Sequence, residues 1–104
     1  MTKFAQQFAA DVDPAVAELM AATQRPITEK ALNDGLVAAD VPWRGLPSWH
    51  IWGSADLNIP AQALQFMADR AGARAAREIE GGSHALGVSQ PGAVAETILE
   101  AYWA

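Results

Sequence analysis

Apolar and polar residues divide this chain into two parts with different periodicities. Up to about residue 40 the apolar positions recur only at helical spacing, whereas beyond residue 41 short apolar runs alternate with helical segments. The first part predicts short helices, and the second predicts a strand, a helix, a second strand and a second helix. We therefore expect a helical segment over residues 1–40 and a β-α-β-α unit over residues 41–104.

The clearest helix signal of the first part is Asp13-Pro14, because Asp caps a helix and Pro suits its first turn. The side chains that follow at helical spacing and would share one face are Val16, Leu19, Met20 and Thr23. Pro26 ends this helix, since the residue before a proline disfavours the helical conformation.

Two weaker helical signals flank that one. Thr28 is placed to cap a shorter helix that runs through Leu32 and stops at Gly35. Residues 4–11 are expected to form another turn or two, with Phe4 and Phe8 on one face because they are four positions apart.

The second part contains two short runs that read as strands. Residues 48–52 are rich in aromatic side chains and lie between the breakers Pro47 and Gly53. Residues 75–80 form a weaker candidate, which Gly81-Gly82 ends. A helix over residues 61–71, with Gly72 as its C-terminal cap, connects the two runs.

A second helix closes the chain. We expect a loop to run as far as Gln90 and Pro91 to open the last helix. The broad apolar face of that helix carries Val94, Ile98, Leu99 and Tyr102.

This order of elements has a geometric consequence. A strand, a helix and a strand at this spacing predict a parallel pair with a right-handed crossover. The loops over residues 54–60 and 81–90 then leave the carboxyl ends of adjacent parallel strands. In open α/β sheets that edge is where ligands bind.

Each of these two loops carries one residue suited to proton transfer, Asp56 in the first and His84 in the second. An Asp that accepts from one ring nitrogen fixes the His tautomer and stabilises the imidazolium, so that the other nitrogen can act as a general base. Spacing alone also fits structural roles, with Asp56 capping the following turn and His84 an ordinary loop histidine.

Composition and charge exclude several other classes of function. The 104 residues allow one domain, and 51% of them are hydrophobic. The absence of cysteine excludes disulfides, thiolate metal sites and cysteine nucleophiles. A net charge of −5 without a basic cluster argues against nucleic-acid binding.

Other patterns are absent from the sequence as well. No apolar run approaches the roughly 20 residues of a membrane span, and the first residues lack the apolar core of a signal peptide, so we expect a cytoplasmic protein. Two histidines do not suggest a metal site, and no glycine fingerprint suggests a nucleotide cofactor. His50, inside an apolar run, is expected to be a packed histidine of the core or sheet edge.

The loop sequences resemble a known family. Residues 47–60, PSWHIWGSADLNIP, are similar to the acid-bearing strand and loop of the α/β-hydrolase family, and residues 81–84, GGSH, are similar to its histidine loop. The resemblance covers residues 43–104, and residues 1–40 are more loosely similar to the family's helical cap. It implies a partial α/β-hydrolase fold, with two parallel strands, flanking helices and an N-terminal cap segment.

By this resemblance, Asp56 matches the acid and His84 the base of a Ser–His–Asp catalytic triad. Family members run in the order Ser, Asp, His, and this chain contains no G-x-S-x-G. The serines near the expected site do not lie on a strained strand-to-helix turn, and Ser89 is expected to cap the last helix; they are Ser48, Ser54, Ser83 and Ser89.

The sequence therefore resembles the C-terminal part of a serine hydrolase with esterase-like acyl hydrolysis of a small molecule, and it is expected to be inactive alone. The family also includes lyases, haloperoxidases, epoxide hydrolases and dehalogenases, so the substrate stays open. The alternative is a non-catalytic interaction module that retains the hydrolase scaffold. An independent nucleotide-binding domain is a third possibility without a supporting motif.

Two parallel strands alone leave both sheet edges open and apolar surface uncovered. Leaving several hundred Å² exposed costs roughly 10 kcal/mol, which is as large as the whole stability of an ordinary domain. We therefore expect a partner, either the missing N-terminal half or a second copy that pairs through the open sheet edge.

The first prediction concerns the isolated chain. It should bind a hydrophobic dye strongly and elute from a sizing column as a multimer, because uncovered apolar surface favours association. Dye fluorescence and light scattering measure this, and a sharp monomer peak with cooperative melting would contradict it.

Overall fold

The fold was analysed in a computed structural model that describes residues 2–37, 39 and 41–104. The sequence predicts a change from a helical to an alternating strand-and-helix pattern near residue 41. Residue 40, directly before it, lies outside the described residues. The elements in chain order are α1 (Lys3–Phe8), α2 (Pro14–Ala22), α3 (Glu29–Asn33), a 3-10 helix η1 (Pro42–Gly45), β1 (Trp49–Gly53), α4 (Ala61–Ala71), β2 (Ala75–Ile79), α5 (Leu86–Ser89) and α6 (Pro91–Trp103).

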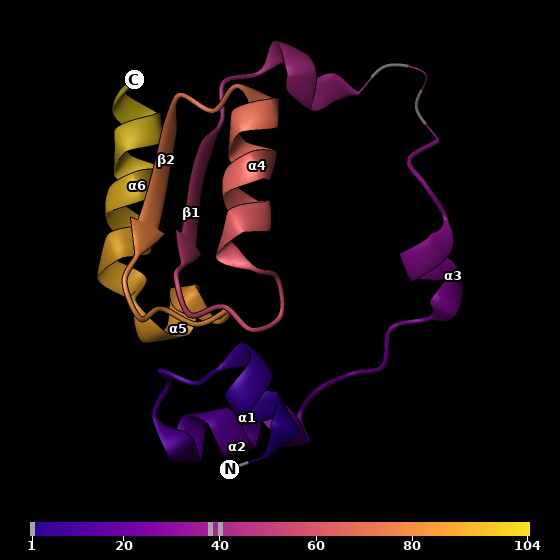
Figure 1. The fold of residues 1–104 in the computed structure, drawn as a ribbon, viewed down its shortest axis with the longest axis vertical. Coiled ribbons are helices and arrows are strands. Elements are labelled where there is room, and N and C mark those ends of the chain that lie inside the picture. Colours follow the sequence, from indigo (N-terminus) through magenta and orange to yellow (C-terminus); the bar gives the residue numbers. More distant parts are fainter. Residues whose placement is uncertain (1, 38, 40) are drawn as a thin grey trace.

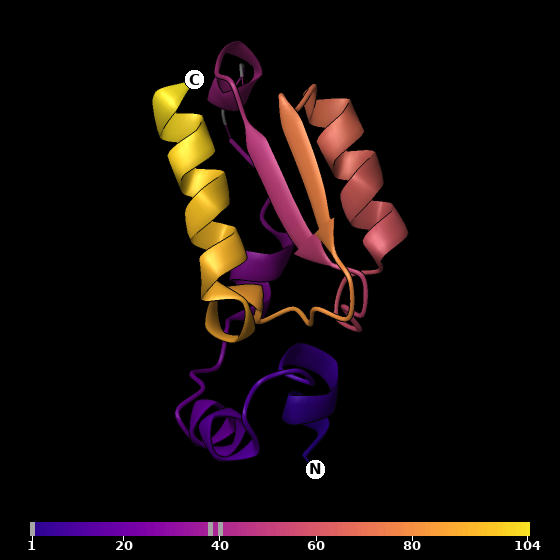
Figure 2. The same cartoon turned by 90° about the vertical axis from the view of Figure 1, so that its left-hand side faces the viewer.

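The two strands form a parallel pair, as the sequence predicts. Their register runs from Trp49 opposite Ala75 to Gly53 opposite Ile79. Helix α4 connects the strands, and Figure 2 shows the sheet between α6 and α4. Both strands consequently end at the same edge, where the loops after them begin. The predicted α/β architecture is confirmed.

Local signals explain where most helices begin and end. Asp13 accepts hydrogen bonds from the N–H groups of the first turn of α2, and Thr28 does the same for α3, so both predicted caps are confirmed. Helix α4 spans the predicted residues and ends at Gly72, which has a φ of 63°. Glycine adopts this left-handed conformation without steric cost.

The region between β2 and the last helix differs from the prediction of a continuous loop. A short helix, α5, occupies residues 86–89 there. The prediction that Ser89 caps the last helix is wrong, because α6 has no side-chain cap and the Ser89 hydroxyl instead donates to the Ala85 carbonyl. A serine hydroxyl can back-bond to the carbonyl one turn earlier in its own helix instead of capping the next helix.

Helices α1 and α2 lie beyond the carboxyl ends of the strands, next to the loops (Figure 1). They form a small buried cluster of their own. Its buried members are Ala5, Ala9, Val12 and Ala17, and partly buried side chains pack against it at Phe4, Phe8, Met20 and Ala85. The division of the chain at residues 40 and 41 stays a prediction, although Ala85 already joins the N-terminal cluster to the second part.

Only part of the apolar face predicted for α2 is buried, because Met20 packs against the N-terminal cluster while Val16 and Leu19 face water. Leu19 is 64% exposed and Val16 is 41% exposed, whereas Ala17 is buried. The short side chain of Ala17 lets α2 approach α1 closely, which the larger residues on the neighbouring face would prevent.

Much apolar surface remains in contact with water elsewhere. The Cα radius of gyration is 15.3 Å, compared with about 13 Å for a compact domain of this length. Figure 1 shows the reason, since the connection through α3 runs far from the strands. On α6, which packs against β1, the predicted apolar residues Ile98, Leu99 and Tyr102 are all more than half exposed.

Two glycines allow the ends of the strands and their loops to touch. A Cβ atom on Gly53 would lie 2.0 Å from the carbonyl oxygen of Gly82, and one on Gly82 would lie 3.1 Å from the Cα of Gly53. The Gly82 carbonyl also accepts a hydrogen bond from the Ala55 N–H at 3.0 Å. The loop after β1 is therefore held directly against the loop after β2.

The second prediction tests this backbone contact. Gly53→Ala should destabilise the chain by at least about 2 kcal/mol, because backbone atoms must move apart to admit the methyl group. Gly92→Ala is the matched control, since a Cβ there meets nothing within 4 Å and alanine favours a helix. Urea unfolding measures both, and equal stability of the two variants would contradict the prediction.

Candidate active site

The loop after β1 places Asp56 at the carboxyl edge of the sheet. The loop is anchored by the Ser54 N–H, which donates to the Ile79 carbonyl at 2.9 Å, and by the Ser54 hydroxyl, which accepts from the Gly81 N–H at 2.8 Å. Both bonds join it to the end of β2. Asp56 lies two residues after Ser54 and is buried, with only 3% of its side chain exposed.

The two oxygens of the Asp56 carboxylate have different partners. Oδ1 accepts hydrogen bonds from the backbone N–H groups of Asn58 at 2.8 Å and Ile59 at 2.9 Å. Oδ2 lies 2.7 Å from Nδ1 of His84. One oxygen thus closes the local turn while the other binds the histidine, so the structural and the functional interpretation of Asp56 both hold.

The His84 ring is hydrogen-bonded at Nδ1, and the rest of its side chain is partly exposed. Its side chain is 32% exposed, and its ring meets the Phe8 ring edge to face, with 4.9 Å between the centroids. Among the described residues, no hydrogen bond reaches Nε2 of His84. The hydrogen bond to Asp56 favours the tautomer with the proton on Nδ1, which leaves Nε2 free to accept a proton.

Burial and hydrogen bonding act on Asp56 in opposite directions. Burial alone raises the pKa of the Asp56 carboxyl, but the N–H groups of Ile59 and Asn58, together with the His84 ring and its charge, outweigh it and lower the pKa below its ordinary value. The carboxylate is therefore ionised at neutral pH, which is the form that stabilises an imidazolium.

A cavity of about 120 Å³ adjoins the pair. Asp56 and His84 line it on the polar side, and Leu64 and Leu86 are among its apolar walls. Small-molecule pockets in proteins usually measure about 300 Å³ or more. The cavity beside Asp56 and His84 is therefore smaller than a typical small-molecule pocket.

The serines of the described chain do not bind His84. The hydroxyl of Ser54 serves the anchor to β2, that of Ser83 accepts from the Ala85 N–H at 3.3 Å, and that of Ser89 back-bonds in α5. No described serine hydroxyl is hydrogen-bonded to the His84 ring. The structure thus offers no substitute for the nucleophile that the sequence lacks.

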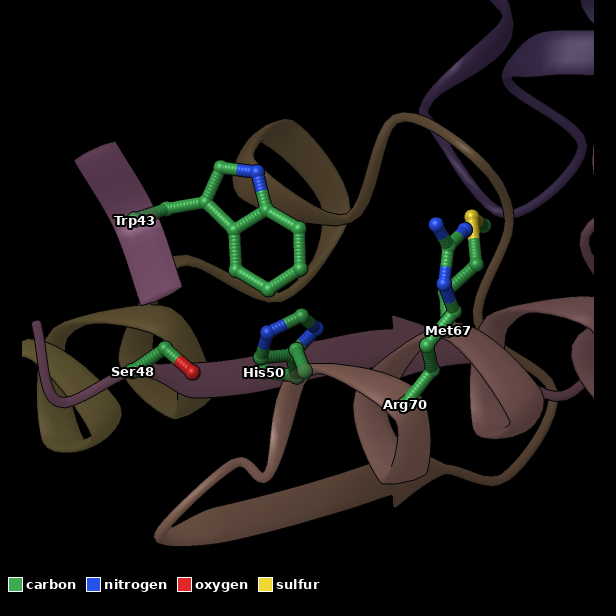
Figure 3. Close-up of a pocket in the computed structure, with 6 residues that line it drawn as sticks. Trp43, Ser48, His50, Met67 and Arg70 are labelled. Atoms are coloured by element: carbon green, nitrogen blue, oxygen red, sulfur yellow. The ribbon is translucent and has the colours of Figure 1, made fainter. Parts of the chain in front are cut away.

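His50 lies away from this site. It is half-buried near the start of β1, on an apolar pocket of about 350 Å³ that Trp43, Ser48, Met67 and Arg70 also line (Figure 3). The pocket contains neither Asp56 nor His84. The partial burial of His50 agrees with the prediction of a packed histidine.

In the described part of the chain, no group of three or more His, Asp or Glu side chains could hold a metal ion. No described helix has the length and apolarity needed to cross a membrane.

Sequence reasoning missed the contribution of the N-terminal segment to this site. The Phe8 ring touches His84, the Phe8 carbonyl accepts from the Ala85 N–H at 2.7 Å, and the Gln7 side chain donates to the Asn58 side chain at 3.0 Å. The available signal was the spacing of Phe4 and Phe8, which predicts a shared face but not what that face contacts.

Comparison with known proteins gives one match. The sequence model of the alpha/beta hydrolase family matches residues 1–97, which includes both the N-terminal helices and the two loops of the site. No curated protein and no solved structure matches the chain.

The third prediction follows from the lowered pKa of Asp56. A carboxyl whose pKa is lower in the folded state stabilises the fold above its unfolded pKa, and this contribution is lost as the pH falls through the folded pKa. The stability of the chain should therefore decrease as the pH falls below about 4, and Asp56→Asn should remove part of that decrease.

Urea unfolding at a series of pH values measures this difference. Asp69→Asn is the matched control, because the Asp69 carboxylate is exposed on α4. An acid-side slope for Asp56→Asn equal to that of the control would contradict the prediction.

Proposed function

The chain belongs to the alpha/beta hydrolase family, and we propose from this premise that Asp56 and His84 are the acid and the base of a Ser–His–Asp triad for esterase-like acyl hydrolysis. The serine would be supplied by residues outside this sequence. The observation that carries the proposal is the 2.7 Å contact between a buried, ionised carboxylate and Nδ1 of His84.

In the proposed reaction each residue has one role, and the contact between Asp56 and Nδ1 of His84 supports the roles of these two. The serine oxygen attacks the acyl carbon of an ester while Nε2 of His84 takes the hydroxyl proton, and Asp56 stabilises the imidazolium. The imidazolium then gives the proton to the departing alcohol. In the second half, Nε2 takes a proton from water as the water oxygen attacks the acyl-enzyme, and that proton returns to the serine.

The proposal also requires a partner at the open side of the sheet. In the described residues β1 pairs with β2 on one edge only. A strand placed parallel to β1 at its free edge would bring its carboxyl end to the edge that holds Asp56 and His84. We propose that the missing N-terminal half of the fold takes this place, with self-association through the same edge as the competing outcome.

Nothing in the Asp56–His84 pair requires a metal or an organic cofactor for this chemistry, because acyl transfer proceeds through proton transfer and nucleophilic attack alone. The substrate class is a small ester or a related acyl compound. The part of the site that would select among such substrates is the wall that lies outside the described cavity.

The fourth prediction is the functional test. An immunoblot of source cells with an antibody against residues 61–74 first shows whether the serine lies on the same polypeptide, in a band well above 11.0 kDa, or on a separate one. The enzyme reconstituted with the nucleophile-bearing part should hydrolyse p-nitrophenyl acetate, and His84→Ala or Asp56→Asn should lower its kcat by about 10⁴-fold.

The chain provides its own control for this test. His50 is the only other histidine, and His50→Ala should leave kcat within a few-fold of the wild type. The chain alone should show no turnover and no labelling by a fluorophosphonate. Equal losses in the two histidine variants, or turnover by the isolated chain, would contradict the proposed function.

A further inference from the structure

The hydrogen bond to Asp56 alone does not fix the orientation of the His84 ring, as a base in proton transfer requires. Its contact with Asp56 fixes one ring atom, but a single hydrogen bond leaves the ring plane free to tilt and the side chain is one-third exposed. Catalytic groups lose activity when they are misplaced by even about 1 Å. Other residues must therefore determine the orientation of the ring.

Phe8 contacts His84 from the side of the N-terminal helices. The two rings meet at an interplanar angle of 86° with centroids 4.9 Å apart, which is a favourable edge-to-face arrangement. The Phe8 ring is itself stacked on Phe4 at 5.4 Å. The Phe8 carbonyl accepts from the N–H of Ala85, the residue directly after His84, so one residue contacts both the ring and the backbone of the histidine loop.

Asp11 lies against the same loop from the turn between α1 and α2. Both of its carboxylate oxygens are buried, and neither completes a hydrogen bond of good geometry. Burial alone would raise the pKa of Asp11, but nearby polar groups, first among them the hydroxyl and the N–H of Ser83, lower it below its ordinary value. Ser83, directly before His84, is only 1% exposed.

A buried carboxylate is costly unless polar groups surround it. The Asp11 oxygens are buried beside Ser83, the residue directly before His84. Phe8 contacts the His84 ring and the N–H of Ala85, the residue directly after it. The two residues of the N-terminal segment therefore lie against both flanks of His84.

We propose that Phe8 and Asp11 are positioning residues that fix the orientation of the His84 ring, so that Nδ1 stays on Asp56 and Nε2 points into the site. The term positioning rests on the function proposed above. The orientation of the ring itself is a property of this chain and can be measured without a nucleophile or a substrate.

The fifth prediction uses the two histidines of the chain. Nitrogen-15 NMR of the imidazoles distinguishes the two neutral tautomers, and a His50→Gln background leaves only the His84 signals. The chain should show at least about a tenfold excess of the Nδ1–H tautomer. Phe8→Leu and Asp11→Asn should each lower this excess by about two- to tenfold.

Each variant has a matched control. Phe66→Leu removes an exposed aromatic ring on α4, and Asp13→Asn changes a carboxylate two positions from Asp11 while retaining a good helix cap. Both controls should keep the wild-type tautomer ratio. Circular dichroism establishes that each variant is folded before its spectrum is interpreted.

Three results would overturn the proposal. The first is a wild-type chain in which neither His84 tautomer is in excess. The second is a tautomer ratio in Phe8→Leu and Asp11→Asn equal to that in their controls, and the third is unfolding of both variants while both controls stay folded, because the two residues would then serve stability alone. If one variant unfolds, the other decides the question by its tautomer ratio. Failure of the esterase test leaves this result unchanged, because the spectrum is recorded without catalysis.

Discussion

The close approach of the Gly53 and Gly82 backbones is the constraint on which the site depends. Parallel strands bring their loops to one edge, but they do not by themselves bring side chains within bonding distance. Here the absence of two Cβ atoms lets the Ala55 N–H reach the Gly82 carbonyl at 3.0 Å, and the two loops are joined. Asp56 and His84 follow these joined positions by one to two residues, so their 2.7 Å contact follows from the backbone contact.

The Asp56 carboxylate then connects local structure to chemistry. The oxygen that closes the turn at Asn58 and Ile59 prevents rotation of the side chain, and this leaves the other oxygen aimed at His84. The same hydrogen bonds keep the pKa of the carboxyl low in spite of its burial. A residue that only capped a turn would not need a second, buried partner, so the turn acts here as a support for the pair.

The N-terminal helices belong to the same physical unit as the loops. Phe8 and Gln7 contact the histidine loop and the acid loop respectively, and the family match from residue 1 to residue 97 spans both parts. The open edge of β1 and the exposed apolar faces of α2 and α6 lie elsewhere on the molecule. In the described chain, many contacts therefore surround Asp56 and His84, whereas much of the apolar surface elsewhere is exposed to water.

Sequence by itself determined the caps at Asp13, Thr28 and Gly72, the two strands, the helix between them, and the placement of Asp56 and His84 on loops at one edge of the sheet, because these depend on local conformation and on the topology of parallel strands. Tertiary structure decided which face of α2 is buried, the formation of α5, the Gly53–Gly82 contact, and the approach of Phe8 and Asp11 to the histidine loop. All of these features except α5 join residues that are distant along the chain. Periodicity shows which face of an element is apolar, but only packing in three dimensions selects the neighbour that this face meets.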